Sequence, residues 1–316
     1  IEMKIKPSEI SIVFQGTINP TFIAKGVDSA RNIFPGAEII ISTWKGECVP
    51  RTVEKLCDAV LYNDDPGGIV FCRDGSIQNH NRQIVSSIAG ISRTTRKYVM
   101  KLRSDMLILG DEFLRFYSKY KKRHKDFVVF KDRIIINSYC TNDSRGRCPC
   151  LFHPSDWVSF GLREDLLNLW GIPLAEEPQM SQYFRLNPEK YSPNKNILTR
   201  WHSEQYIWLS CLRNNGYNIE FDTWFSFDKK LAWQSDVSLV NNFIVLDYKK
   251  SMSVLSQKYE SVNNGAGILN HNGWLYLYHK YVDNSIKVPF ATKVVYHLGL
   301  KPVKDRIEKI IYKYFG

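Results

Sequence analysis

The sequence contains no apolar run that approaches the roughly 18 or more residues needed to cross a membrane as a helix. It also contains no stretch with the character of a secretory signal. Residues 3–7 are polar, and no apolar segment follows them. We therefore expect a cytoplasmic protein.

Several nucleotide-binding and nucleic-acid-binding patterns are also missing. No Gly-x-Gly-x-x-Gly follows the first apolar strand and no Walker A pattern occurs, which argues against a dinucleotide-dependent or P-loop enzyme. There is no zinc finger, helix-turn-helix or RNA-binding signature, so we expect no nucleic-acid partner. The seven cysteines are odd in number and scattered, as is usual for reduced thiols. Cys148-Pro149-Cys150 has the wrong spacing for a zinc pair, so we expect Cys140, Cys148 and Cys150 near His153 to be free loop thiols.

Acidic residues are in short supply. Lys and Arg number 43 against 32 Asp and Glu, a net charge of 43 − 32 = +11, which favours anionic partners such as phosphorylated substrates or an anionic membrane. The excess gathers at 119–125 and in the last fifty residues. We expect residues 304–314 to form a helix with Ile307, Ile310, Ile311 and Tyr314 inward and Lys304, Arg306, Lys309 and Lys313 outward. Such a helix either lies on an anionic membrane or caps the domain.

What the first third of the chain does contain is a regular alternation of short apolar strands and helices. Strands are expected at 10–14, 38–42 and 59–62, separated by helices at 21–32 and from residue 50, with a further helix at 79–93. This alternation predicts a mostly parallel sheet with helices on both faces. Ligands bind beyond the carboxyl ends of such strands, where polar residues stand here. These residues are Gln15, Thr17, Ser42, Thr43, Trp44, Asn63, Asp64 and Asp65.

The stretch Tyr98–Leu109, YVMKLRSDMLIL, is an apolar run interrupted by Arg103-Ser104-Asp105. Charged groups inside a buried strand are costly unless they have partners. In the structural interpretation these residues belong to an ion pair or to a strand end. In the functional interpretation the strand ends in a cleft, where Asp105 meets a metal or a diphosphate and Arg103 meets an anion. Arg82 stands in the first turn of a helix, where the dipole disfavours a cation, so it lies on a solvated face or points at a phosphate.

The remaining two thirds give weaker signals. We expect a helix at 111–120, paired strands at 127–130 and 133–137, and a strand at 217–227. A helix should begin near Trp201, with Ser203 as its N-cap and Glu204 in its first turn. No repeats or low-complexity linkers separate these segments, so we expect one continuous catalytic unit.

Several segments, taken in order, resemble the WavE lipopolysaccharide-synthesis family of bacterial glycosyltransferase-like proteins. The resemblance covers roughly residues 9–260 and is carried by their combination. The segments are SIVFQGTI, EIIISTWKGE, LYNDDPGG, NRQIVSSIAGI, YVMKLRSDMLI, FHPSDWVSFG, HSEQYIW and NNFIVLDYKK.

The resemblance implies a GT-A-like, Rossmann-type α/β fold with a mixed, mostly parallel sheet flanked by helices and a C-terminal helical extension. It divides the chain into a nucleotide-binding half at about 9–110, an acceptor half at about 111–260, and a basic helical extension at 261–316. The implied activity is transfer of a sugar from a nucleotide-sugar donor to a saccharide or lipid-linked saccharide of lipopolysaccharide or capsule. The basic segments would then give peripheral contact with the anionic inner face of the bacterial inner membrane.

The resemblance also implies roles for particular residues. Base and ribose would be held by Gln15, Thr17, Thr43, Trp44 and Asp64 or Asp65, and the diphosphate by Arg82 and Arg103. Asp105 would take the last position of an Asp-x-Asp motif and bind a divalent cation, Mn²⁺ or Mg²⁺. Glu204 resembles the acid that faces the acceptor and would act as base if the configuration is inverted, with Asp156 as second candidate. His202 would be a metal ligand, a phosphate donor or a structural residue.

The sequence departs from that pattern at Arg103, which stands where the first Asp would be. Arg103 would therefore take over part of the work of the metal. Two further interpretations stay open. The chain could be a non-catalytic nucleotide- or glycan-binding protein with a degenerate transferase fold, or a nucleotidyltransferase, which would release pyrophosphate.

Overall fold

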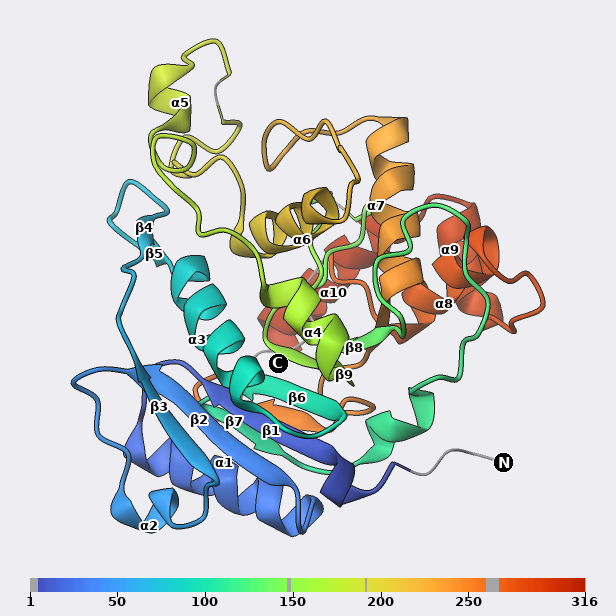
Figure 1. The fold of residues 1–316 in the computed structure, drawn as a ribbon. Coiled ribbons are helices and arrows are strands. Elements are labelled where there is room, and N and C mark those ends of the chain that lie inside the picture. Colours follow the sequence, from blue (N-terminus) through green and yellow to red (C-terminus); the bar gives the residue numbers. More distant parts are fainter. Residues whose placement is uncertain (1–4, 147–148, 191, 260–266, 316) are drawn as a thin grey trace.

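The computed structural model describes residues 5–146, 149–190, 192–259 and 267–315, and its centre is a seven-stranded sheet (Figure 1). The strands lie in the order β10 (Phe243–Leu246), β8 (Ile134–Asn137), β9 (Val158–Leu162), β6 (Tyr98–Arg103), β1 (Ile10–Gln15), β2 (Glu38–Trp44) and β3 (Ala59–Asn63). Within this sheet β9 is antiparallel to both of its neighbours, whereas all the other pairings are parallel. The predicted mixed, mostly parallel α/β sheet is confirmed.

Helices cover both faces of the sheet, as the alternation predicts. α1 (Pro20–Ile33) packs on one face and α3 (His80–Arg93) on the other, where α4 (Arg163–Trp170) follows it (Figure 1). A Cβ atom at Gly90 of α3 would lie only 2.4 Å from Val13 Cγ1 and 3.2 Å from Ser42 Cβ. The close approach of α3 to β1 and β2 therefore depends on glycine at this position.

The described residues form further helices and small strands. They are η1 (Pro7–Glu9), α2 (Arg51–Glu54), η2 (Glu112–Phe116), α5 (Tyr183–Leu186), α6 (Ser203–Asn214), α7 (Lys229–Asn242), α8 (His271–Tyr281), α9 (Phe290–His297) and α10 (Lys301–Phe315). β4 (Ile69–Val70) pairs with β5 (Ile77–Gln78), and β7 (Met106–Ile108) pairs antiparallel with β11 (Val254–Ser256). None of the helices formed by the described residues combines the length and the apolar character needed to cross a membrane.

Three predicted elements are wrong. Residues 127–130 form no strand, because the N–H groups of Val129 and Phe130 donate to Asn242 Oδ1, at 2.8 and 3.2 Å, instead of to a neighbouring strand. Residues 217–227 are irregular, and the N–H of Trp224 donates to the carbonyl of Arg200 at 2.7 Å. The helix expected at 111–120 is only the short 3₁₀ turn η2.

Two expectations about helix ends and faces are also wrong. The N-cap of α6 is His202, whose N–H donates to Gln205 Oε1 at 3.0 Å, and Ser203 is the first helical residue. In α10, Ile307 and Ile310 face solvent instead of the core. The side chains of Lys309, Ile311, Lys313 and Tyr314 lie outside the described residues.

Candidate functional site

The carboxyl ends of β1, β2 and β6 open into a cleft of about 600 Å³. Because these three strands are parallel neighbours, Gln15, Trp44 and Arg103 end at the same edge of the sheet. The cleft brings together six of the residues proposed from the sequence: Gln15, Thr17, Trp44, Arg82, Arg103 and Asp105. It is also lined by residues that sequence reasoning missed, among them Asn19, Phe22, Asn79, Gln83, Ser104, Lys258 and Tyr259.

The loop from β1 to α1 forms one wall of the cleft and is held by backbone hydrogen bonds. Gly16 adopts a φ of +109°, a conformation that favours glycine, and its N–H donates to the carbonyl of Ser42 at 3.0 Å. Ser104 Oγ donates to the carbonyl of Thr17 at 2.6 Å, which fixes this loop to the end of β6. Gln15 is buried and its Oε1 accepts from Ser86 Oγ of α3 at 2.7 Å. The wall is therefore preorganised by contacts from three elements.

Arg103 and Asp105 form a bidentate ion pair at the floor of the cleft. Arg103 Nε and Nη2 donate to the two carboxylate oxygens of Asp105, each at 3.0 Å, and Ser256 Oγ donates to Asp105 Oδ2 at 3.0 Å. The guanidinium lies over the ring of Trp157 at 4.4 Å and near the ring of Tyr259 at 5.5 Å. Cation–π contacts and the planar fork of arginine hold the group in one orientation.

This arrangement does not fit the divalent cation expected at Asp105. Both carboxylate oxygens already accept from Arg103 and Oδ2 also accepts from Ser256, so Asp105 has few lone pairs left for a metal ion. Mn²⁺ and Mg²⁺ favour several oxygen ligands. The described ranges hold no group of three His, Cys, Asp or Glu side chains placed to bind a metal ion.

Arg82 faces the cleft from the first turn of α3, and Asp65 holds it there. Arg82 Nε and Nη2 donate to the carboxylate of Asp65 at 2.8 and 2.9 Å, and Nη1 donates to Asn79 Oδ1 at 2.8 Å. These hydrogen bonds from Arg82 lower the pKa of Asp65. Asp65 thus acts through Arg82 and does not itself line the cleft. The side chain of Asn79, the N-cap of α3, bonds to Arg82 instead of capping the helix.

Besides Asp65, two further residues proposed for nucleotide contact lie outside the cleft. Thr43 is fully buried, and its hydroxyl lies 3.4 Å from a carboxylate oxygen of Glu47. It alternates along β2 with Trp44, so only one of the two can face the cleft. Asp64 is exposed and pairs with Lys45 at 2.8 Å on the surface.

A cluster of acidic and histidine side chains lies beside the cleft. In the antiparallel pair of β6 and β9, Val158 lies opposite Leu102, so Asp156 and Trp157 arrive next to Arg103. Glu204, at the start of α6, places Oε2 3.4 Å from His153 Nε2. Burial raises the pKa of the Cys140 thiol; the carboxylates of Glu204 and Asp156 add to that shift and Arg103 opposes it. All three side chains are therefore close to Cys140, and the cluster adjoins the cleft.

Glu204 and His153 lie side by side in a buried environment that disfavours charge on either group. His153 Nδ1 lies 2.8 Å from the carbonyl of Cys140 and must donate to it, which leaves the lone pair of Nε2 toward Glu204. Burial, followed by the charge of Asp156, raises the pKa of Glu204 well above the usual range, and burial lowers the pKa of His153. Both groups are therefore favoured in their neutral states.

The polar groups around this pair are incompletely satisfied. Within the described residues, Asp156 Oδ1 and His202 Nε2 are buried without a hydrogen-bond partner. Lys101 of β6 is fully buried, donates to the carbonyl of Asp156 and lies over the ring of Trp170 at 4.2 Å. Burial lowers the pKa of Lys101 to about 7. Burial also lowers the pKa of His202 to about 3, so His202 is a neutral side chain with a free ring nitrogen. Groups left this way commonly mark functional sites.

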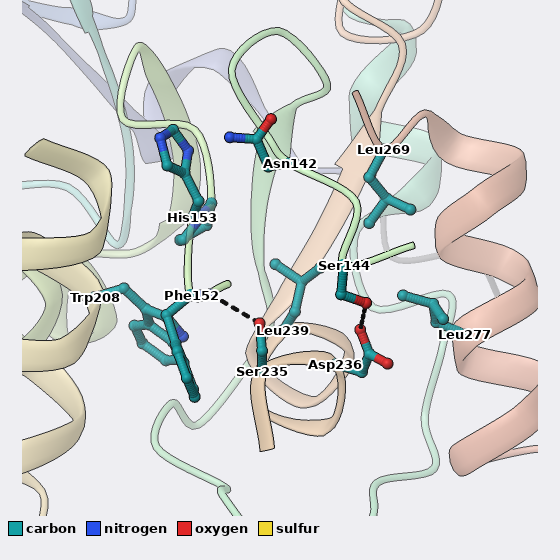
Figure 2. A pocket seen from close by; sticks show the side chains of 11 residues that line it. Asn142, Ser144, Phe152, His153, Trp208, Ser235, Asp236, Leu239, Leu269 and Leu277 are labelled. Atoms are coloured by element: carbon teal, nitrogen blue, oxygen red, sulfur yellow. Dashed lines mark hydrogen bonds between the residues drawn. The ribbon is translucent and has the colours of Figure 1, made fainter. Parts of the chain in front are cut away.

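On its other side, the segment that carries His153 packs against a small closed cavity (Figure 2). The cavity measures about 10 Å³, roughly the space of one water molecule. Its wall includes the hydrogen bonds from Phe152 N to Ser235 Oγ and from Ser144 Oγ to Asp236 Oδ1, both 2.8 Å long. The close packing fixes the backbone of His153 and leaves no room for a substrate on that side.

Comparison with known proteins places the chain in a family. The family model for WavE lipopolysaccharide synthesis matches residues 10–312. The chain belongs to this family. The match extends beyond the resemblance seen in the sequence, which ended near residue 260, and includes α8, α9 and most of α10. No curated protein matches the chain.

Two solved structures with partial similarity are glycosyltransferases. The first is the mannosyltransferase PcManGT from Pyrobaculum calidifontis in complex with GDP-Man and Mn²⁺, with a TM-score of 0.32 and 12% identity, covering 53% of this chain and 49% of that one. The second is the apo-form glycosyltransferase GlyE of Streptococcus pneumoniae TIGR4, with a TM-score of 0.32 and 10% identity, covering 67% of this chain and 45% of that one. This WavE-family chain thus matches only about half the length of either.

Proposed function

We propose that this WavE-family protein is a glycosyltransferase that moves a sugar from a nucleotide-sugar donor to a saccharide acceptor of lipopolysaccharide or capsule. The observation that carries the proposal is the convergence of two arginines, Arg82 and Arg103, on one polar cleft at the carboxyl ends of parallel strands. Both guanidiniums are oriented by carboxylates, and arginine forks match phosphate oxygens.

The cleft would hold the donor, with the nucleotide along the wall that Gln15, Thr17 and Trp44 form. Arg82 and Arg103 would meet the diphosphate, and Arg103 would stabilise the negative charge that develops as the nucleotide leaves. Since the residues present do not fit a divalent cation, no step of the proposal passes through a metal. In this account residues 9–110 form the donor half and residues 111–260 the acceptor half.

Glu204 is the proposed base for the acceptor hydroxyl. The acceptor oxygen forms a bond to the anomeric carbon while the bond from that carbon to the phosphate oxygen breaks. The hydroxyl proton goes to Glu204, and the bonding electrons leave with the nucleotide. A raised pKa makes Glu204 a stronger base once it is ionised. Asp156 is the second candidate, because it precedes β9 near the end of β6 and its charge acts on Glu204.

A binding screen followed by a transfer assay tests the proposal. The wild-type chain should be stabilised against heat by one of UDP, GDP, CMP or dTDP, because a ligand that binds only the native state raises the Tm. The sugar nucleotide of that base, supplied with a lipopolysaccharide extract, should release free nucleotide in an amount that Glu204→Gln abolishes. Binding without release would favour the non-catalytic binding protein, and release of pyrophosphate would favour a nucleotidyltransferase.

A further inference from the structure

The last two helices expose an unusual amount of apolar side chain. Phe290 at the start of α9 is 82% exposed and Leu298 at its end is 63% exposed. On α10, Val303, Ile307 and Ile310 are 55%, 52% and 50% exposed. We call these five residues the α9–α10 ridge. Exposed apolar side chains gathered on two consecutive helices indicate a site of interaction with another surface.

The orientation of α10 explains why the ridge faces outward. Val303, Ile307 and Ile310 are spaced by four and three residues, so they share one face of the helix. Lys301 and Asp305 lie on the opposite face, are buried, and form an ion pair. The helix therefore turns a charged pair toward the protein and its apolar stripe toward solvent, the reverse of an ordinary surface helix.

The charge around the ridge is strongly positive. From residue 287 to the end, seven Lys and Arg residues accompany two acidic residues, a balance of 7 − 2 = +5. Arg306 is exposed beside Ile307, and Lys293 is exposed on α9. Of the two acids, Asp305 is buried against Lys301 and is withdrawn from the surface.

We propose that the α9–α10 ridge docks on the surface of an anionic membrane, with both helices lying along the interface. An apolar stripe flanked by Lys and Arg is the pattern of helices that lie in the headgroup region, where apolar burial and attraction to anionic lipid act together. A second protein surface would have to be both apolar and acidic to match this ridge.

The docked helix is tied to the reaction site, and this link rests on the proposed function. Lys301 Nζ donates to the carbonyl of Ile268 at 3.2 Å, next to Gly267, whose carbonyl accepts from Asp143 N at 2.8 Å. The neighbouring Asn142 N donates to the carbonyl of His153 at 3.0 Å. These hydrogen bonds connect the inner face of α10 with the segment that carries His153, whose ring lies beside Glu204.

Co-sedimentation with vesicles tests the docking. The full chain should sediment with vesicles that contain phosphatidylglycerol and phosphatidylcholine and much less with vesicles of phosphatidylcholine alone. Replacing Val303, Ile307 and Ile310 together by Ser should reduce partitioning into the anionic vesicles by about tenfold or more. Arg306→Glu changes the charge by two, and at about fivefold per charge it should reduce partitioning roughly 25-fold. Leu186→Ser, which alters an equally exposed leucine on α5, is the matched control and should bind as the wild type does.

Any of three results would overturn the proposal. Two of them are a wild-type chain that does not sediment with anionic vesicles and a triple Ser variant that sediments as well as the wild type. The other is a stable dimer in sedimentation velocity that the triple Ser variant abolishes, since the ridge would then be an interface between copies of the chain. The thermal stabilisation by nucleotide is measured on the same variants. It should persist in all of them, because the ridge lies outside the cleft, so failure of docking and failure of the donor site are distinguished.

Discussion

Replacing Arg103 should weaken binding of the nucleoside diphosphate. The wild-type chain should bind the same nucleotide without a metal ion. The guanidinium already holds Asp105 with two bonds of 3.0 Å and is 26% exposed. Hydrogen bonds to charged groups contribute about 1.5–3 kcal/mol, and partial exposure favours the lower end. Arg103→Gln should therefore cost about 1.5–2 kcal/mol, roughly 10–30-fold in Kd.

Isothermal titration with the nucleotide found in the screen measures this change. Arg185→Gln on α5, an exposed arginine bonded to Gln182 Oε1 at 3.0 Å, is the matched control and should leave Kd unchanged. Arg103→Gln also removes the partner of Asp105, so the double variant with Asp105→Asn separates loss of folding from loss of binding. Wild-type affinity should survive a chelator. An unchanged Kd in Arg103→Gln, or wild-type binding that vanishes with chelator and returns with Mn²⁺, would refute the reasoning.

Three further predictions concern the acid–histidine cluster and the packing of α3. Because the charge of Asp156 helps raise the pKa of Glu204, Asp156→Asn should shift the acidic limb of the pH–rate profile to lower pH. An acidic limb at the same pH in the variant would contradict the effect of Asp156 on Glu204. A carboxyl whose pKa is raised in the folded state contributes stability that is present below its unfolded pKa and is lost as pH rises through the folded pKa. Glu204→Gln should therefore abolish transfer yet raise the Tm near pH 8. A lower Tm of Glu204→Gln at that pH would show that the buried carboxylate is stabilising. Gly90→Ala should lower the free energy of unfolding in urea by about 2 kcal/mol, because its Cβ would lie 2.4 Å from Val13 Cγ1. Val13→Ala in the same chain should restore part of this loss. Equal stability of wild type and Gly90→Ala would mean that α3 is free to shift.

The first half of the fold could be predicted because its signals are local. β1, β2 and β6 are short apolar runs with helical periodicity between them, and polar residues at their ends share an edge once the strands are parallel. The sequence could not reveal that Asp105 is paired to Arg103 or that Asp65 serves Arg82. An ion pair and a ligand cleft need the same residue types, and only the geometry separates them.

The second half was harder because long-range contacts decide its conformation. Residues 127–130 look like a strand, yet the side chain of Asn242, more than a hundred residues away, takes their N–H groups. His153 drew attention only as a zinc ligand, since its role depends on Glu204 on a distant helix. In α10 the periodicity correctly indicates a helix, but periodicity alone does not say which face is inward. The buried pair of Lys301 and Asp305 reverses the usual orientation.

Hydrogen exchange measured with and without the bound nucleotide tests the central claim, that the cleft at the ends of β1, β2 and β6 is the donor site. Protection should concentrate in residues 15–19 and 103–105, which line the wall and floor of the cleft. Unchanged exchange in these segments, with protection elsewhere, for example in the basic cluster at 119–125, would contradict the assignment of the donor site.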